Sequence, residues 1–257
     1  MIHPQAIIDP SAELAEDVSV GPYSVIGPHV TIEAGTQIGP HVVIQGPTHI
    51  GRENRILQFA SLGSDPQDKK YRGEPTALVI GDRNVIRESV TINRGTINGN
   101  GRTVIGNDNL LMAYIHIAHD CRIGNNTIFS NNASLAGHVH IEDWVILSGF
   151  TLVHQFCSIG AHAFTGMGSA ISKDVLPYLV VSGNPARPHG INKEGLKRRG
   201  FTPEQINYLR RAYKLLYRQG LALEQARVLL AELAAEEPAV MPMLEFMQQD
   251  MRRSIIR

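Results

Sequence analysis

The sequence predicts a parallel β-solenoid followed by a small α-helical domain, and three observations support this prediction. Aliphatic residues recur every six positions from Ile2 to Ile171, this period is then lost, and apolar residues at helical spacing follow. The period provides 26 slots, of which 24 hold Ile, Leu or Val. No α-helix repeats every six residues, and a strand alone alternates every two. A period of six therefore indicates a solenoid whose units are a short strand plus a turn.

Each unit has a second regular position, four residues after the aliphatic slot, that usually carries a small or β-branched residue such as Ser24, Cys121 or Ala133. The units resemble those of the left-handed β-helix, in which three hexapeptides form one triangular coil. Residues n and n+18 then stack, and the aliphatic slots form ladders along the core. The left hand is an exception to the right-handed crossover rule and is taken from this resemblance.

Glycine follows the aliphatic slot in many units. Because glycine lacks a Cβ, we expect it to occupy corners that need unusual backbone dihedrals. The glycines concerned are Gly21, Gly27, Gly39, Gly51, Gly81, Gly106, Gly124 and Gly160.

The period is interrupted twice, and both interruptions are expected to be loops that leave the solenoid. The first is the polar stretch at about 63–79, and the second is the Gly- and Asn-rich stretch at about 93–104, whose length cannot stay in phase with the repeat. Long excursions from a regular scaffold are often functional.

The chain is expected to divide into a β-helix over residues 1–189 and a helical domain over residues 190–257, with a Pro- and Gly-containing linker at 181–195. Thr202-Pro203-Glu204-Gln205 is typical of a capping box with proline at the first helical position. Three helices are predicted from apolar residues at helical spacing. Their apolar positions are Ile206, Leu209, Tyr213 and Leu216; Leu223, Ala226, Leu229, Leu230 and Leu233; and Leu244, Met247, Met251 and Ile255.

Composition narrows the classes of function. Lys and Arg together number 24, as do Asp and Glu, so global charge gives no case for nucleic-acid binding. Residues 190–220 hold eight Lys and Arg against two Glu, an excess that suggests an acidic or phosphate-bearing partner, or simply a solvated helix face. We expect no signal peptide and no membrane span, and therefore a cytoplasmic protein.

Both cysteines, Cys121 and Cys157, occupy the small inward slot, two coils apart. Two coils span roughly 10 Å, which exceeds the reach of a disulfide. We therefore expect two core residues rather than a nucleophile or metal ligands.

The coil arithmetic brings several of the 11 histidines together. His119, Gly137 and Gln155 share one column because they differ by 18; Asp120 and His138 share the next, and His154 lies on the other side. His116 lies just upstream on the same coil as His119. His140 and His162 fall in other columns and are assigned no role.

A His and Asp cluster beside glycine suits general-base acyl transfer. An imidazole can accept a proton from a hydroxyl at neutral pH, and the N–H of Gly137 could approach a developing oxyanion unobstructed. A polar solenoid face that happens to carry His is one alternative. Another is zinc bound by His116, His119 and a third His, as in solenoid zinc hydratases.

The chain closely resembles, over essentially its whole length, the UDP-N-acetylglucosamine 3-O-acyltransferases of lipid A biosynthesis. The segments that carry the resemblance are Gln67–Tyr71, Ile80–Thr96, His116–Cys121, Leu135–Val139, Val153–Cys157 and Glu194–Phe201. The resemblance implies a homotrimer of parallel prisms with active sites between subunits. It also implies transfer of an (R)-3-hydroxyacyl group from acyl carrier protein to the glucosamine 3-hydroxyl, without a cofactor or a metal.

The resemblance also implies roles for single residues. His119 matches the general base, Asp120 the acid paired with it, and Gly137 the backbone donor to the thioester oxygen. Arginine suits the nucleotide end because its guanidinium binds phosphate oxygens in pairs. The residues that match the family's cleft-lining positions are His116, His138, His154 and Gln155. Those that match its sugar and phosphate contacts are Asp68 and Lys70, and those that match the nucleotide end are Asn192, Glu194, Arg198 and Arg199.

Two positions depart from the family pattern. Met167 stands between two glycines where the pattern has glycine, and in this family the position bounds the end of the acyl groove. A long side chain there predicts a shortened groove for about ten carbons, because overpacking a rigid cavity is costly. Lys69 stands where a hydrophobic residue can occur, so its contact with nucleotide is not assigned.

Three other functions are alternatives for a solenoid of this kind. The N-acyltransferase acting later in the same pathway carries an additional N-terminal domain, whereas here the repeat begins at Ile2. A zinc hydratase would contain bound metal. A non-catalytic or ice-binding solenoid would need a flat Thr face, and Thr is scattered among the columns of this sequence.

Overall fold

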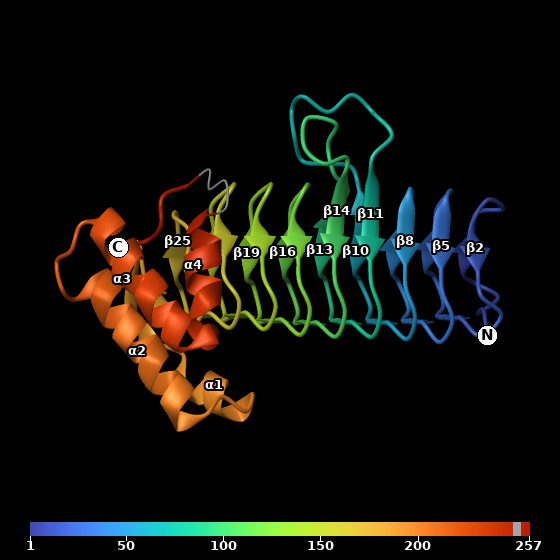
Figure 1. Ribbon diagram of the computed structural model, residues 1–257. Helices are drawn as coiled ribbons and strands as arrows, with labels where there is room; N and C mark the ends of the chain where they lie inside the picture. Colours follow the sequence, from blue (N-terminus) through green and yellow to red (C-terminus); the bar gives the residue numbers. More distant parts are fainter. Residues whose placement is uncertain (249–252) are drawn as a thin grey trace.

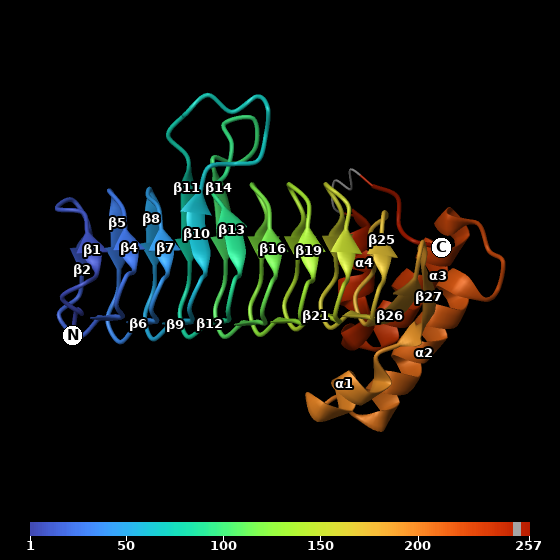
Figure 2. The same ribbon diagram turned by 180° about the vertical axis from the view of Figure 1, so that it is seen from behind.

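The computed structural model describes residues 1–248 and 253–257 and forms a three-sided β-helix with helices at one end (Figures 1 and 2). The fold class expected from the sequence, a left-handed parallel β-helix with a C-terminal helical region, is confirmed. The first sheet has nine strands: β1 (Ile7–Ile8), β4 (Val25–Ile26), β7 (Val43–Ile44), β10 (Ser61–Ser64), β13 (Thr91–Asn93), β16 (His116–Ile117), β19 (Ser134–Leu135), β22 (Leu152–Val153) and β25 (Ala170–Ile171).

The other two sides of the prism are built in the same way. The second sheet comprises β2 (Glu13–Leu14), β5 (Val30–Ile32), β8 (Thr48–Ile50), β11 (Ala77–Ile80), β14 (Arg102–Ile105), β17 (Arg122–Ile123), β20 (His140–Ile141) and β23 (Ser158–Ile159). The third comprises β3 (Ser19–Val20), β6 (Gln37–Ile38), β9 (Arg55–Ile56), β12 (Val85–Ile86), β15 (Leu110–Leu111), β18 (Ile128–Phe129), β21 (Ile146–Leu147), β24 (Phe164–Thr165), β26 (Leu179–Gly183) and β27 (Ala186–Ile191).

The aliphatic slots point into the prism, as the six-residue period predicts. Strands pair in parallel with residues 18 apart in register, for example Ile117 with Leu135. Slots in the middle coils, such as Ile44 and Leu147, are fully buried. In the first coil Ile2 is 48% exposed, because none of the described strands stacks on its outer side.

The reason expected for the glycines is wrong. None of the eight glycines that follow an aliphatic slot has a positive φ; the left-handed corner lies two residues further on and holds non-glycine residues such as His41 and Trp144. Glycine is required instead by close approach of the next coil. A Cβ on Gly106 would lie 2.5 Å from the carbonyl oxygen of Gly124.

Both interruptions leave the prism at the corner between the first and second sheets, and they project from the same edge (Figure 1). Strands β10 and β11 reach Ser64 and Ala77, so the first loop spans 65–76, and the second spans 94–101 between β13 and β14. Both loops are therefore shorter than the sequence indicated. Ile80 pairs with Ile50 and Ile105 with Ile80, so the coils continue in phase around each insertion.

The segment expected to be a linker is mostly a β-hairpin. Strands β26 and β27 pair antiparallel, with Gly183 opposite Ala186, and β26 also pairs with β24. The hairpin thereby continues the third sheet past the last aliphatic slot. Its sequence lacks the six-residue period because an antiparallel pair does not need to form a coil.

Helices cover the end of the prism (Figure 2). A short helix that was not predicted, α1 (Lys193–Arg198), precedes α2 (Pro203–Tyr217). Helix α2 begins as predicted, with Thr202 and Gln205 forming a capping box and Pro203 at the first position. The four apolar positions predicted for this helix are all buried.

The second and third predicted helices are α3 (Leu223–Glu236) and α4 (Met241–Gln248), joined by the short 3-10 helix η1 (Pro238–Val240). Leu229 is 37% exposed, so it does not belong to the apolar face of α3. Met251 lies outside the described residues. Ile255 is not helical: it forms an isolated bridge with Asp174.

No helix within 1–248 is both long and apolar enough to cross a bilayer. The two cysteines are free and fully buried, as predicted. Burial raises the pKa of both thiols to about 12, which keeps them protonated and unreactive at neutral pH.

The close approach of successive coils gives a stability prediction. Gly106→Ala should destabilise the protein by about 1–3 kcal/mol, because the added methyl group meets backbone that cannot move aside. Gly149→Ala is the matched control, since a Cβ there meets its nearest atom at 3.5 Å, an ordinary contact. Denaturant unfolding of both variants measures the difference; equal loss of stability in the two would contradict the argument.

Candidate active site

The candidate site lies at the corner between the first and second sheets, where the chain turns from β16 into β17. His119 and Asp120 occupy this turn, and His138 occupies the same turn one coil further on. Asp120 and His138 adopt φ values of +61° and +62°. Asp and His tolerate this left-handed region better than bulky residues do, and the turn directs their side chains outward from the prism.

His119 and Asp120 form a hydrogen-bonded pair, with 2.9 Å between His119 Nδ1 and Asp120 Oδ2. The carboxylate is fully buried and also accepts hydrogen bonds from the backbone N–H and hydroxyl of Thr96 and from the N–H of Asn100. Burial opposes its ionisation, but the hydrogen bonds from His119 and Thr96 outweigh burial and lower the pKa of Asp120. Asp120 is therefore a carboxylate at neutral pH.

An ionised Asp120 determines which nitrogen of His119 is basic. A carboxylate can only accept hydrogen bonds, so Nδ1 of His119 carries the proton that it donates to Asp120. The lone pair of the neutral ring then lies on Nε2. His119 is consequently arranged as a general base acting through Nε2.

Thr96 and Asn100 are site residues that the sequence analysis missed. They lie in the second loop, so the insertion places them against Asp120 of the next coil. The interruption of the six-residue period indicated that a loop is present. It could not indicate which residues of the loop turn towards Asp120.

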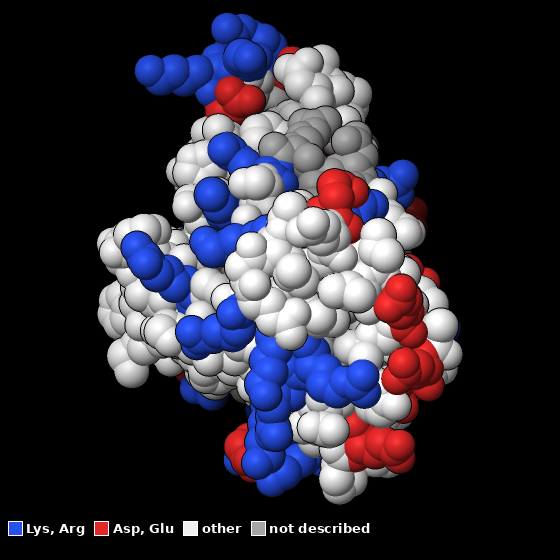
Figure 3. Space-filling view, turned by 60° about the vertical axis from the view of Figure 1, so that its left-hand side comes forward, with Lys and Arg blue, Asp and Glu red and all other residues white. Residues whose placement is uncertain are grey.

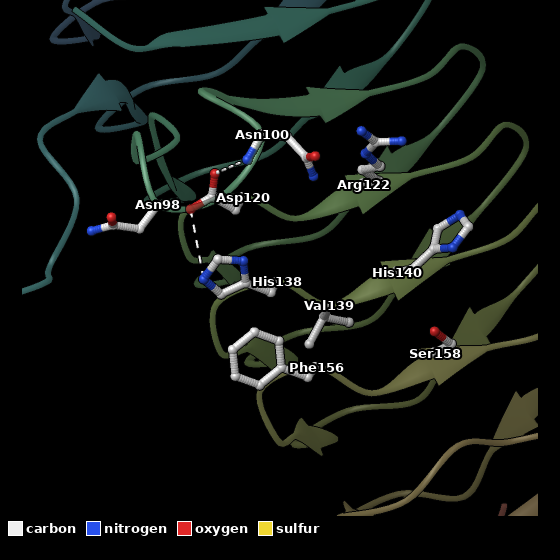
Figure 4. Close-up of a pocket in the computed structure, with 10 residues that line it drawn as sticks. Asn98, Asn100, Asp120, Arg122, His138, Val139, His140, Phe156 and Ser158 are labelled. Carbon is white, nitrogen blue, oxygen red and sulfur yellow. Dashed lines mark hydrogen bonds and ion pairs between the residues drawn. The ribbon is translucent and has the colours of Figure 1, made fainter. Parts of the chain in front are cut away.

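His138 packs beside this pair. Its ring stands edge-on to His119, with 5.1 Å between ring centroids, and stacks on Phe156 at 4.6 Å. Its Nε2 lies 3.8 Å from Asp120 Oδ2. Figure 4 shows Asp120 between Asn100 and His138, with Phe156 below.

Gly137 lies directly against the His119 ring. A Cβ at this position would be 2.6 Å from Cε1 of His119 and 2.8 Å from Nε2, so any side chain would displace the imidazole. The N–H of Gly137 has no acceptor among the described residues. A backbone donor without a protein acceptor, on a residue that lies against the imidazole, is a candidate for stabilising an oxyanion.

The first loop forms one wall of a cavity of about 590 Å³ over His119. Asp68 and Lys70 line it, together with Gln155 from the coil beyond Gly137. The remaining lining residues are Gln67, Lys69, Thr96, Asn98, His119, His138 and Phe156. Lys69, which has no role assigned from the sequence, therefore also faces the cavity.

A second hollow of about 250 Å³ adjoins the second loop and is lined by Asp120, His138 and Phe156 (Figure 4). Arg122, His140 and Ser158 line it from the second sheet. His140, to which no role was assigned, thus lies beside the site. Its pKa is lowered mainly by burial, so the ring is neutral at pH 7.

His116 and His154 are close to the cavity without lining it. His116 lies on β16, where its Nδ1 is 2.8 Å from the hydroxyl of Thr91 on the preceding coil. Burial, and then His119, lower the pKa of His116. His154 contacts Arg253 of the C-terminal segment, a residue that the sequence analysis did not single out.

The residues matched to the nucleotide end lie elsewhere, at the start of α1. Asn192 caps this helix by accepting a hydrogen bond from the Gly195 N–H, and it donates to the carbonyl of His162. Glu194 lies near Lys197 on the surface. Neither Asn192 nor Glu194 lines either of the two cavities beside the His119–Asp120 pair.

Arg198 and Arg199 differ in their surroundings. Arg198 is exposed, whereas Arg199 lies over the ring of Trp144 and has its Nη1 3.1 Å from Nδ1 of His162. Burial and the Arg199 charge lower the pKa of His162 to about 4, so its neutral ring accepts this hydrogen bond. His162, which was given no role, is therefore part of the packing of Arg199.

Met167 is 77% exposed and lies at a different corner, between the third and first sheets. Its side chain lies near Gly149 of the preceding coil. Within one chain it does not bound the cavity over His119.

His119, Asp120 and His138 can bring one ligand atom each within 4.8 Å of one another. The donor set suits a metal poorly, because the Asp120 carboxylate already accepts hydrogen bonds from four donors. The fold and this His–Asp corner together define a hexapeptide-repeat transferase, and a model described as bacterial transferase hexapeptide (six repeats) matches residues 102–137.

Comparison with known proteins identifies the family. A model of the second domain of UDP-N-acetylglucosamine O-acyltransferase matches residues 174–256. The acyl-[acyl-carrier-protein]–UDP-N-acetylglucosamine O-acyltransferase of Pseudomonas entomophila is 62% identical over 239 residues, which are 93% of each chain. That of Herminiimonas arsenicoxydans is 62% identical over 92% of this chain and 89% of its own.

Solved structures agree. The UDP-N-acetylglucosamine acyltransferase of Francisella novicida matches with a TM-score of 0.98 and 45% identity, covering 100% of this chain and 94% of its own. That of Moraxella catarrhalis matches with a TM-score of 0.97 and 46% identity over 100% and 99%. The chain belongs to the UDP-N-acetylglucosamine O-acyltransferase family, which sets aside the N-acyltransferase, zinc hydratase and scaffold alternatives.

The two arginines should respond differently to truncation. Arg199→Ala should destabilise the protein by about 1–2 kcal/mol, because it removes a half-buried cation–π contact and a hydrogen bond. Arg198→Ala should leave stability within about 0.5 kcal/mol, as is usual at the surface. Thermal unfolding of the two variants is the measurement. If both were equally stable, the contact between Arg199 and Trp144 would contribute nothing to the stability of the fold.

Proposed function

We propose that this protein transfers an (R)-3-hydroxyacyl group from acyl carrier protein to the 3-hydroxyl of UDP-N-acetylglucosamine, the first step of lipid A biosynthesis, with His119 as general base. The names of the relatives support the reaction class. The observation that carries the role of His119 is its hydrogen bond to Asp120, which leaves Nε2 as the basic nitrogen of a ring that lies against Gly137.

The geometry supports the following steps. Nε2 of His119 takes the proton of the sugar 3-hydroxyl while that oxygen forms a bond to the thioester carbonyl carbon. The carbonyl oxygen becomes an oxyanion, which the N–H of Gly137 stabilises. The C–S bond then breaks, and the departing thiolate receives the proton from the His119 imidazolium, which returns the enzyme to its starting state.

Asp120 contributes without exchanging a proton. Its buried negative charge stabilises the imidazolium that forms on His119, and its hydrogen bonds to Thr96 and Asn100 keep the carboxylate ionised and oriented. Removal of these bonds would leave a buried carboxylate with fewer partners, which is costly.

The nucleotide sugar is placed against the first loop. Asp68 and Lys70 face the cavity with Gln155, and a carboxylate and an ammonium suit sugar hydroxyls and phosphate respectively. We assign His138 to the same cleft, and His116 and His154, which lie beside the cavity without lining it, to the margin of that cleft. Arg198, with Asn192 and Glu194 nearby, is assigned to the nucleotide, and Arg199 to holding that segment in place.

The basic face of the helical end is assigned to acyl carrier protein, an acidic partner. Figure 3 shows Lys and Arg side chains in a band across this end of the molecule, with Asp and Glu gathered to one side. Two hollows there of about 320 and 290 Å³ share Lys193 and Arg210 in their linings. Such complementarity mainly raises the rate of encounter, so binding should weaken with salt.

Met167 and the residues assigned to the nucleotide lie away from His119, either at another corner of the prism or in the helical region at its end. We therefore propose a homotrimer in which each active site lies between two subunits. In that arrangement Met167 and the α1 residues of one subunit face the His119 corner of its neighbour. The cytoplasmic location expected from the sequence stays a prediction.

His119→Ala should lower kcat by about 10²–10⁴-fold, the usual contribution of a general base. The fold should be unchanged because His119 lies outside the aliphatic ladder. Product formation with a hydroxyacyl carrier protein is the measurement, and circular dichroism reports the fold. His49→Ala, an exposed histidine on β8, is the control; activity of His119→Ala within a few-fold of wild type would contradict the mechanism.

Acyl selectivity should favour about ten carbons if Met167 closes the groove. Each methylene buried in an open groove gains about 0.8 kcal/mol, whereas a blocked chain loses that gain and meets a clash of about 1–3 kcal/mol. Met167→Gly should therefore shift preference towards longer chains. Mass spectrometry of products from a series of donor lengths tests this, and an unchanged profile would show that Met167 does not measure the chain.

A further inference from the structure

The C-terminal segment Arg253–Arg257 returns to the prism and is fastened to its last coils. The N–H of Asp174 donates to the Ser254 carbonyl, and the N–H of Ile256 donates to the Asp174 carbonyl. Ile255 and Ile256 are each 5% exposed. The Arg257 guanidinium donates to the carbonyls of Leu216 and Leu221, which ties the end of the segment to the helical domain.

This fastening places Arg253 against the turn after β22. Its Nη2 lies 3.0 Å from Nδ1 of His154, and its Nε donates to the carbonyl of Gln155 at 3.3 Å. One guanidinium therefore holds two neighbouring residues of the coil whose Gln155 side chain lines the cavity over His119.

The contacts of Arg253 determine the proton position on His154. Nδ1 of His154 also lies 3.2 Å from the Gln155 carbonyl, which would need a proton on Nδ1. A guanidinium can only donate, so the contact between Nη2 of Arg253 and Nδ1 of His154 requires a lone pair on Nδ1. A proton on Nδ1 would place two donors against each other, so we take Nδ1 as the acceptor and Nε2 as the protonated nitrogen.

We propose that Arg253 is a positioning residue that holds His154 as the Nε2–H tautomer, so that His154 donates a hydrogen bond to an oxygen of the nucleotide sugar. This inference rests on the proposed function for the identity of the ligand, but not for the tautomer. Arg253 acts through His154 and takes no part in the proton transfer. The backbone of residues 254–256 is hydrogen-bonded to both the N–H and the carbonyl of Asp174. These bonds hold the neighbouring Arg253 guanidinium in place before substrate binds.

Nitrogen-15 NMR of the histidine side chains tests the tautomer in the free protein, with His154→Asn used to assign the signal. We expect wild type to show Nδ1 unprotonated and Nε2 protonated. Arg253→Met should give a mixture of tautomers, and Arg253→Lys, which keeps one donor, should largely restore the wild-type pattern. A proton on Nδ1 in wild type, or no change in Arg253→Met, would overturn the proposal.

Kinetics test the consequence. Arg253→Met should raise KM for UDP-N-acetylglucosamine about tenfold, the size expected for one lost hydrogen bond, with kcat changed only a few-fold and with partial rescue in Arg253→Lys. Lys173→Gln is the charge-matched control, because exposed Lys173 lies two residues after β25 as Gln155 lies two after β22. Thermal unfolding of each variant separates loss of fold from loss of positioning.

The NMR experiment and the kinetic experiment can each fail without the other. If wild type shows the expected tautomer but does not acylate UDP-N-acetylglucosamine, the proposed function is wrong and the tautomer assignment stands. An unchanged KM in Arg253→Met, in active protein whose tautomer has shifted, would overturn the positioning role. An equal rise in KM in Lys173→Gln would assign the effect to charge alone and would overturn it also.

Discussion

Stacking of each coil on the one 18 residues before it is the constraint on which the rest of this structure depends. Backbone hydrogen bonds join every coil to the next, for example from Ala118 N–H to the Leu135 carbonyl, and parallel strands lie only about 4.8 Å apart. A residue can therefore deviate only if its coil stays in register. This explains why inward positions alternate between aliphatic and small side chains, and why Gly106 tolerates no Cβ against Gly124.

The same constraint determines where function can be added. Insertions interrupt the strands only at a corner, and both large ones occur at the corner between the first and second sheets. There the second loop completes the hydrogen bonds of Asp120, and the first forms a wall of the cavity over His119. The rigid ladder thus supplies the spacing between His119, Gly137 and Gln155, while the loops supply the partners that a regular coil lacks.

The C-terminal end shows how a repeat is terminated and used. Hairpin β26–β27 continues the third sheet, the helices cover the last coils, and the segment from Arg253 to Arg257 is hydrogen-bonded to Asp174.

Burial raises the pKa of the Asp174 carboxyl to about 6, and one of its two oxygens accepts a hydrogen bond from the Ser158 N–H. Because the folded state holds this proton more tightly than the unfolded chain, Asp174 contributes stability at acidic pH that is lost as pH rises through about 6.

The sequence by itself determined the fold class, the column containing His119, Gly137 and Gln155, and the start of α2 at its capping box. These features depend on period or on local hydrogen bonding, which neighbouring residues in the chain specify. Tertiary structure decided that glycine serves close approach rather than unusual dihedrals, that the linker forms a hairpin, and that the predicted third helix does not include Ile255. It also selected Thr96, Asn100 and Arg253 as partners of Asp120 and His154. Those contacts join segments about 20 to 100 residues apart, and no periodicity relates such segments, because the chain is brought back to them only by its path in space.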